Sequence, residues 1–105
     1  MKITYRQKQK YGKGFFGTGI QIGYDAKEAH VVEQIKARLL PLGFKFQPSP
    51  AFPSGVLKCF FHKDGTLIFG LQTAKENKEF IEQSYPILLE YDPNMSKTIL
   101  EYDND

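Results

Sequence analysis

The sequence predicts an α+β fold, with a mainly antiparallel sheet of about five strands and two helices packed on one face of that sheet. Three observations lead to this prediction. They are an alternating stretch at 15–24, an apolar stripe at helical spacing after Asp25, and a second alternating stretch at 56–62. Side chains alternate faces along a strand, whereas residues three or four apart share a helix face. At 105 residues the chain is predicted to be a single domain, 1–105.

Residues 15–24 are predicted to form the central strand, after a short first strand at 3–6. One of its faces carries β-branched or aromatic side chains: Phe16, Thr18, Ile20, Ile22 and Tyr24. The other face is nearly bare: Gly17, Gly19, Gln21 and Gly23. Glycine weakens a strand by roughly 0.5–1 kcal/mol relative to alanine. Three glycines on one face therefore indicate a close approach by another element, and we expect the following helix to lie on this glycine face.

The first helix is predicted to begin after Asp25 and to end near Leu40. Asp25 with Glu28 has the spacing of a capping box. Pro41 is incompatible with a helix interior, and Gly43 suits the left-handed residue that commonly follows a helix. The apolar stripe that should face the sheet is Ala29, Val32, Ile35, Leu39 and Leu42.

A hairpin is predicted to follow a strand at 44–47 and a proline-rich loop at 48–55. Its strands are 56–62 and 66–71, joined by a three-residue loop at 63–65. This register is favoured because it gathers six apolar side chains on the core face: Leu57, Cys59, Phe61, Leu67, Phe69 and Leu71. The opposite face then carries Lys58, Phe60 and His62, and it should be mixed and half-exposed.

The second helix is predicted to begin at a Thr73–Glu76 capping box. Phe80, Ile81 and Tyr85 form its apolar stripe, and Pro86 should end or kink it.

The C-terminal part contains a short repeat, Leu-Glu-Tyr-Asp at 89–92 and again at 100–103. A turn at 92–94 separates the two copies and predicts a closing hairpin. The 11-residue spacing of the copies also suits two helical segments. The sequence therefore leaves two alternatives for residues 87–102, a hairpin or two helical segments.

Composition and cysteine content favour the cytoplasm. The one cysteine, Cys59, excludes an internal disulfide and suits a reducing compartment. The first 15 residues are basic and polar, unlike a secretory signal. No apolar run approaches the roughly 18 residues that would span a bilayer, so we expect no membrane contact.

The charge distribution is uneven along the chain. Residues 1–24 carry five cations and no acid, whereas 76–105 carry eight acids and two lysines. The two ends could neutralise each other, or the basic end could bind an anionic partner. Near the N-terminus cations and aromatic residues are interleaved, a pattern that suits phosphates and unstacked bases: Tyr5, Arg6, Lys8, Lys10, Tyr11, Lys13 and Phe15.

Catalytic chemistry has one candidate, His62, which lies beside Lys63 and could act as a general acid or base. No second histidine or carboxylate is placed beside it by spacing. Cys59 is predicted to face the core and to be inert. The glycine pattern at 12–17 runs into an extended stretch rather than a helix, which argues against a dinucleotide site.

Metal and cofactor binding are not expected. One cysteine and two separated histidines do not make a zinc ligand set. The C-terminal acids lack the spacing of a calcium loop: Glu90, Asp92, Glu101, Asp103 and Asp105.

The sequence therefore favours a non-enzyme, a small binding or accessory protein that acts through a macromolecular partner, with a protein as the first hypothesis. Homo-oligomers are compatible with this. The alternative is a nucleic-acid-binding module that uses the basic aromatic N-terminal segment, and a third hypothesis is a small ribonuclease that uses His62. The candidate binding residues are Tyr5, Arg6, Lys8, Lys10, Tyr11, Lys13, Phe15, Lys58, Phe60 and His62.

Overall fold

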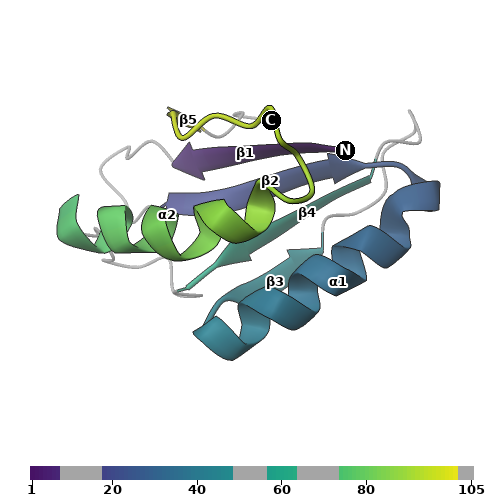
Figure 1. Ribbon diagram of the computed structural model, residues 1–105, viewed down its shortest axis with the longest axis horizontal. Helices are drawn as coiled ribbons and strands as arrows, with labels where there is room; N and C mark the ends of the chain where they lie inside the picture. Colours follow the sequence, from purple (N-terminus) through teal and green to yellow (C-terminus); the bar gives the residue numbers. More distant parts are fainter. Residues whose placement is uncertain (8–17, 49–56, 64–73, 102–105) are drawn as a thin grey trace.

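The computed structural model describes residues 1–7, 18–48, 57–63 and 74–101. In these residues five strands form one sheet in the order β3-β4-β2-β1-β5. The strands are β1 (Lys2–Gln7), β2 (Thr18–Tyr24), β3 (Lys45–Pro48), β4 (Leu57–His62) and β5 (Ile99–Glu101). The helices α1 (Ala29–Leu39) and α2 (Ala74–Leu88) lie on the same side of the sheet (Figure 1). The predicted α+β class is confirmed.

The strand pairing is mainly antiparallel, as predicted. β1 pairs with β2, β2 with β4, and β4 with β3, all in antiparallel register. The pairing of β5 with β1 is parallel, so the sheet is mixed at that edge.

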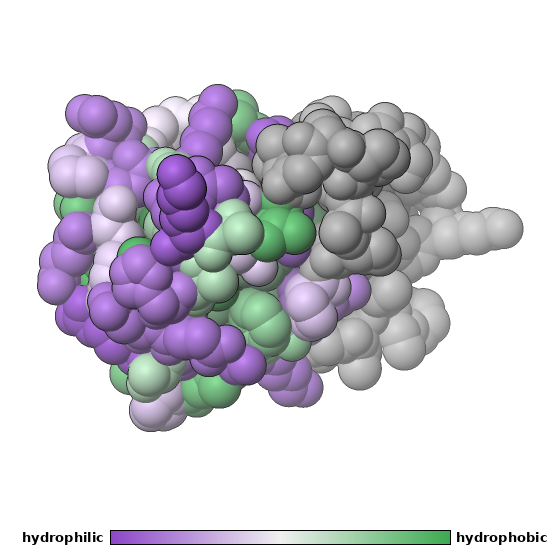
Figure 2. All heavy atoms as spheres, turned by 90° about the vertical axis from the view of Figure 1, so that its right-hand side faces the viewer, coloured by the Kyte–Doolittle hydropathy of each residue, from purple (hydrophilic) through white to green (hydrophobic). Residues whose placement is uncertain are grey.

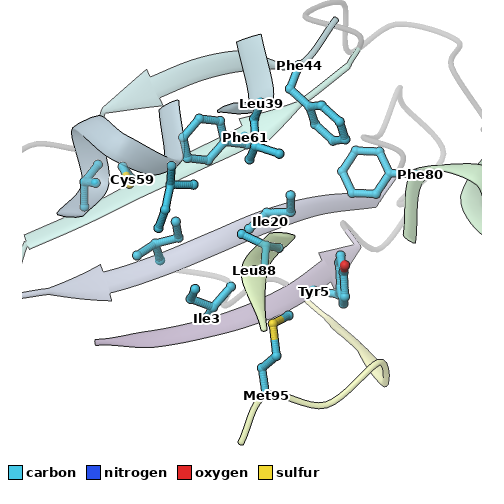
Figure 3. Packing of buried hydrophobic residues seen from close by; sticks show 13 residues of the cluster. Ile3, Tyr5, Ile20, Leu39, Phe44, Cys59, Phe61, Phe80, Leu88 and Met95 are labelled. Carbon is cyan, nitrogen blue, oxygen red and sulfur yellow. The ribbon is translucent and has the colours of Figure 1, made fainter. Parts of the chain in front are cut away.

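The core lies between the sheet and the two helices, and one row of side chains crosses all five strands. Phe46 is in register with Phe61, Phe61 with Ile20, Ile20 with Tyr5, and Tyr5 with Ile99. From the helix layer, Leu39, Phe80 and Leu88 pack onto this face of the sheet (Figure 3). Each large apolar side chain buried in this way contributes roughly 1.5–3 kcal/mol.

The helices cover the apolar face of β2, not the glycine face, so the prediction of a helix on the glycines is wrong. Ile20 and Ile22 are fully buried in the helix-covered core. Gly23 points to the other side, and a Cβ built there would meet no atom within 4 Å. Gly19 is buried. The helices pack on the apolar side chains because burying these side chains makes the dominant favourable contribution to folding. Glycine offers no side chain to bury.

The start of the first helix agrees with the predicted capping box. The Asp25 side chain accepts the N–H of Lys27 at 3.0 Å, and the Glu28 carboxylate accepts the N–H of Asp25 at 3.2 Å. The first turn, η1 (Ala26–Glu28), is a 3₁₀ turn that leads into α1.

The predicted end of this helix is also confirmed. Pro41 lies in a 3₁₀ turn, η2 (Leu40–Leu42), and Gly43 follows with a φ of 94°. The N–H of Gly43 donates to the Leu40 carbonyl at 3.0 Å. The buried part of the predicted stripe is Val32, Ile35 and Leu39. Its two ends, Ala29 and Leu42, are exposed.

The two faces of β4 are as predicted, but its pairing partner is not. Cys59 and Phe61 are buried, while Lys58, Phe60 and His62 are half-buried. Both edges of residues 59–61 are paired, one with β2 and the other with β3. The predicted hairpin pairing of these residues with 66–71 is therefore wrong, and 66–71 itself lies outside the described residues.

Pro86 does not end the second helix, which continues to Leu88. Phe80, Ser84 and Leu88 recur every fourth residue and are all buried, so packing of the last turn favours its helical conformation. Proline removes the hydrogen bond that the Glu82 carbonyl would receive, and Glu82 is exposed, where water can replace that bond. Thr73, the predicted cap, lies outside the described residues.

The segment after α2 is neither the predicted hairpin nor a helix. The predicted turn is present, because the N–H of Met95 donates to the Asp92 carbonyl at 3.1 Å. The Asp92 carboxylate accepts the N–H of Ile3 at 3.0 Å, and Met95 is buried. These contacts lead the chain to β1, where β5 forms. No helix that the structure describes is long and apolar enough to cross a membrane.

Candidate binding face of the sheet

The sheet side chains that point away from α1 and α2 form a surface that we call the distal face. Side chains alternate along each strand, so residues next to the core positions belong to it. Its assigned members are Lys2, Thr4, Arg6, Gly19, Gln21, Gly23, Lys45, Gln47, Lys58, Phe60, His62 and Leu100.

Strand register arranges the middle of the distal face in rows. In the central row Gln47 is paired with Phe60, Phe60 with Gln21, and Gln21 with Thr4. The ring of Phe60 thus has a polar side chain in register on both neighbouring strands. Gln47 is exposed, and Phe60 and Gln21 are half-buried.

Cationic residues lie in the rows on both sides of this central row. On one side Lys58 is paired with Gly23, and Gly23 with Lys2. On the other side Lys45 is paired with His62 across β3 and β4. Arg6 is paired with Leu100 across β1 and β5.

The distal face is cationic over its described residues. It carries Lys2, Arg6, Lys45 and Lys58, and none of its assigned members is a carboxylate. The described acids whose side chains can be placed lie elsewhere, around the two helices and in the turn after α2. Viewed from the right-hand side of Figure 1, the described surface is mostly hydrophilic, with smaller apolar areas between (Figure 2). The positive charge of the distal face is the feature from which we infer binding.

The predicted binding residues divide into three groups. Arg6, Lys58, Phe60 and His62 come together on the distal face, and the Arg6 Nε donates to Thr4 Oγ1 at 3.3 Å. Tyr5 lies in the core. The remaining predictions are outside the described residues: Lys8, Lys10, Tyr11, Lys13 and Phe15.

Tyr5 belongs to the buried core and not to the distal face. It is fully buried, and its hydroxyl lies 2.7 Å from Ser84 Oγ. Burial raises the pKa of Tyr5 to about 12. The ring is therefore neutral and inaccessible to a base or phosphate.

Sequence reasoning missed Lys2, Lys45, Gln21 and Gln47. Each alternates with an apolar core residue, so the strand pattern itself indicated a side chain on the opposite face. The strand order could not be read from that pattern, and it is this order that places Lys45 of β3 and Lys2 of β1 on one surface.

His62 is not beside Lys63 in space, contrary to the pairing considered for acid–base chemistry. Lys63 Nζ hydrogen-bonds the Gln83 side chain on α2 and lies 4.9 Å from the Phe44 ring centroid. It therefore reaches toward the helix layer, whereas His62 belongs to the distal face. The residue in register with His62 on that face is Lys45.

Other reactive groups in the described residues are held in structural contacts. Cys59 is buried, and burial raises the pKa of its thiol to about 12, so the nucleophilic thiolate is disfavoured. Glu90 is paired with Arg38 at 2.9 Å, which lowers the pKa of that carboxyl. Within the described ranges, no three histidine, cysteine, aspartate or glutamate residues are grouped as metal ligands.

Comparison with protein-family models, curated proteins and solved structures finds no match to this chain.

Proposed function

We propose that the protein is a non-catalytic binding domain whose distal face meets a macromolecular partner of negative charge. The observation that carries this proposal is the positive charge of that face, which has four cations and no carboxylate among its assigned members. Lys2 and Lys45 are exposed, and Arg6 and Lys58 keep part of their surface in solvent. Cys59, the one cysteine of the sequence, is a free buried thiol, which suits a reducing compartment, so we place the proposed function in the cytoplasm.

Lysines on two strands flank Gly23 on the distal face. Lys58 and Lys2 lie on either side of it across two strand spacings, about 10 Å at the usual separation of paired strands. Gly23 leaves room there because no atom lies within 4 Å of its Cβ position. An anionic group that enters this space would have a lysine on each side.

The ribonuclease hypothesis receives less support from the same geometry. General acid–base cleavage needs a second group near the histidine that exchanges protons close to neutral pH. The in-register neighbour of His62 is a lysine, and His30 is an exposed residue of α1 on the other side of the sheet. A lysine beside the histidine suits anion binding better than proton transfer at neutral pH.

The test compares two charge-reversed variants that change net charge equally. The first, Lys2→Glu with Lys58→Glu, alters the distal face. The second, Lys27→Glu with Lys78→Glu, alters exposed residues around the helices. Binding of heparin and of polyglutamate is measured by fluorescence anisotropy, with neutral dextran as the uncharged control and circular dichroism to verify folding.

We expect the first variant to lose binding by about tenfold or more, and the second to stay within about twofold of the wild type. Equal losses in the two variants, or no binding of either polyanion by the wild type, would refute the assignment of the distal face.

A further inference from the structure

We infer that the anionic partner is a single-stranded nucleic acid that stacks a base on Phe60, an inference that rests on the proposed function. The recognition chemistry combines a π-face for the base with cations for the phosphates on either side. This chemistry is shared by single-stranded RNA and DNA, and the experiment below distinguishes them.

Phe60 is placed where a stacked base would have polar groups beside it. It lies on β4, with β3 on one side and β2 on the other. Its in-register neighbours on the distal face are Gln47 and Gln21. Each amide has both a donor and an acceptor and so matches the hydrogen-bonding edge of a base. An aromatic ring with an amide on each side suits a base better than it suits a carboxylate.

The cations are spaced to hold phosphates on both sides of that base. Residues two apart on one strand share a face and lie roughly 7 Å apart. Lys58 is displaced from Phe60 by this distance in one direction along β4, and His62 is displaced by it in the other. Lys2 extends the first cationic row, and Lys45 stands in register with His62 in the second. A strand crossing the rows would therefore meet a cation before and after the stacked base.

The same arrangement fits a duplex or an acidic protein less well. Bases inside a duplex are already stacked on one another, and its grooves admit a helix or a two-stranded ribbon rather than the broad face of a sheet. An acidic protein surface offers carboxylates to the lysines but no flat ring to Phe60. A single-stranded nucleic acid offers both phosphates and bases, as in sheet-based recognition of nucleic acids generally.

The experiment measures the affinity of the full chain for four labelled probes by fluorescence anisotropy over a salt series. The probes are oligouridine and oligodeoxyuridine of about 12 nucleotides, a duplex of the same length, and polyglutamate. Phe60→Leu removes the ring and keeps an apolar side chain, whereas Phe60→Tyr keeps the ring. Tyr91→Leu removes a half-buried aromatic ring on the helix side and serves as the control.

The expected result is preferential binding of a single strand. Phe60→Leu should weaken it by about tenfold, while Phe60→Tyr and Tyr91→Leu stay near the wild type. Lys2→Ala with Lys58→Ala should reduce the slope of log affinity against log salt by about 1.4, since each phosphate contact to a single strand contributes about 0.7. A preference for oligouridine identifies RNA as the partner. Equal affinities show that the protein does not distinguish ribose from deoxyribose.

Several outcomes overturn the inference. Polyglutamate binding that equals or exceeds single-strand binding, with Phe60→Leu unchanged, leaves the proposed function standing with an acidic protein as partner. Tighter binding of the duplex rejects stacking. Loss of every probe rejects both the inference and the proposed function. Should Phe60→Leu fail to fold, an unchanged salt slope in the lysine variant still contradicts the inference.

Discussion

The hydroxyl of Tyr5 on β1 donates a buried hydrogen bond to Ser84 Oγ on α2 at 2.7 Å. The direction follows from the second contact of Ser84, whose own proton is donated to the Phe80 carbonyl at 2.7 Å. Both residues are fully buried, and the rings of Tyr5 and Phe80 meet edge to face with centroids 6.3 Å apart. A polar link thus holds the second helix to the first strand in an otherwise apolar core.

The first prediction concerns the asymmetry of this pair. Tyr5→Phe leaves Ser84 bonded to Phe80 and should lower the free energy of unfolding by about 0.5–1.5 kcal/mol. Ser84→Ala leaves the Tyr5 hydroxyl buried without its acceptor and should cost more, about 1–3 kcal/mol. Urea unfolding of both single variants and the double variant measures the coupling. We expect the double variant to lose less than the sum, and additive losses would contradict the direct bond.

The second prediction is a loss of stability in alkali. The pKa of Tyr5 rises from 10.0 to about 12 on folding and that of Cys59 from 9.0 to about 12, both because of burial. The folded state therefore holds these protons more tightly than the unfolded state. This stabilisation is complete below pH 9.0 and is lost progressively as the pH rises toward 12.

Tyr5→Phe with Cys59→Ala removes both titrating groups and serves as the comparison. Its unfolding free energy should fall less steeply with pH across this range. Identical slopes for the wild type and the variant would show that other groups cause the alkaline loss.

The third prediction separates two glycines by conformation and space. Gly43 has a φ of 94°, so Gly43→Ala should destabilise the protein by about 1 kcal/mol or more. Gly23 has open space at its Cβ position, so Gly23→Ala should stabilise the strand by up to about 0.5–1 kcal/mol. Thermal melts of the two variants check this contrast. A lower melting temperature for Gly23→Ala would contradict the open space at this position.

The fourth prediction concerns the carboxylate that joins the C-terminal segment to β1. Asp92 accepts the backbone N–H of Ile3 at 3.0 Å. Asp92→Ala should cost about 1.5–3 kcal/mol, as expected for a hydrogen bond to a charged group, and should speed amide exchange at Ile3. Asp92→Asn keeps an acceptor oxygen and should fall between the wild type and the alanine variant. Unchanged exchange at Ile3 in Asp92→Ala would show that this bond does not protect the strand.

Local features of the fold were predictable because they depend on neighbouring residues. The capping box at Asp25 and the left-handed Gly43 follow from backbone groups a few positions away. The alternation of Cys59 and Phe61 with Phe60 likewise fixed the two faces of β4 without knowledge of its neighbours.

Long-range features were not predictable from the same patterns. The parallel docking of β5 on β1 depends on contacts of Asp92 and Met95 with residues distant in sequence. The side of β2 that receives the helices could not be decided from its glycines, because a bare face admits either a close neighbour or open space. The candidate site shares this limit, since its residues come from separate strands whose order brings them together.

The most direct test of the central claim is a two-dimensional ¹H–¹⁵N NMR titration of the wild-type protein with oligouridine of about 12 nucleotides. We expect the largest chemical-shift changes at the amides of Phe60, Lys58, Gln21 and Lys2, with small changes along α1. The Phe60 ring protons, followed in parallel ¹H–¹³C spectra, should shift upfield as a base stacks on them. Shifts confined to the helix side, or uniform shifts that vanish at physiological salt, would contradict a binding role for the distal face.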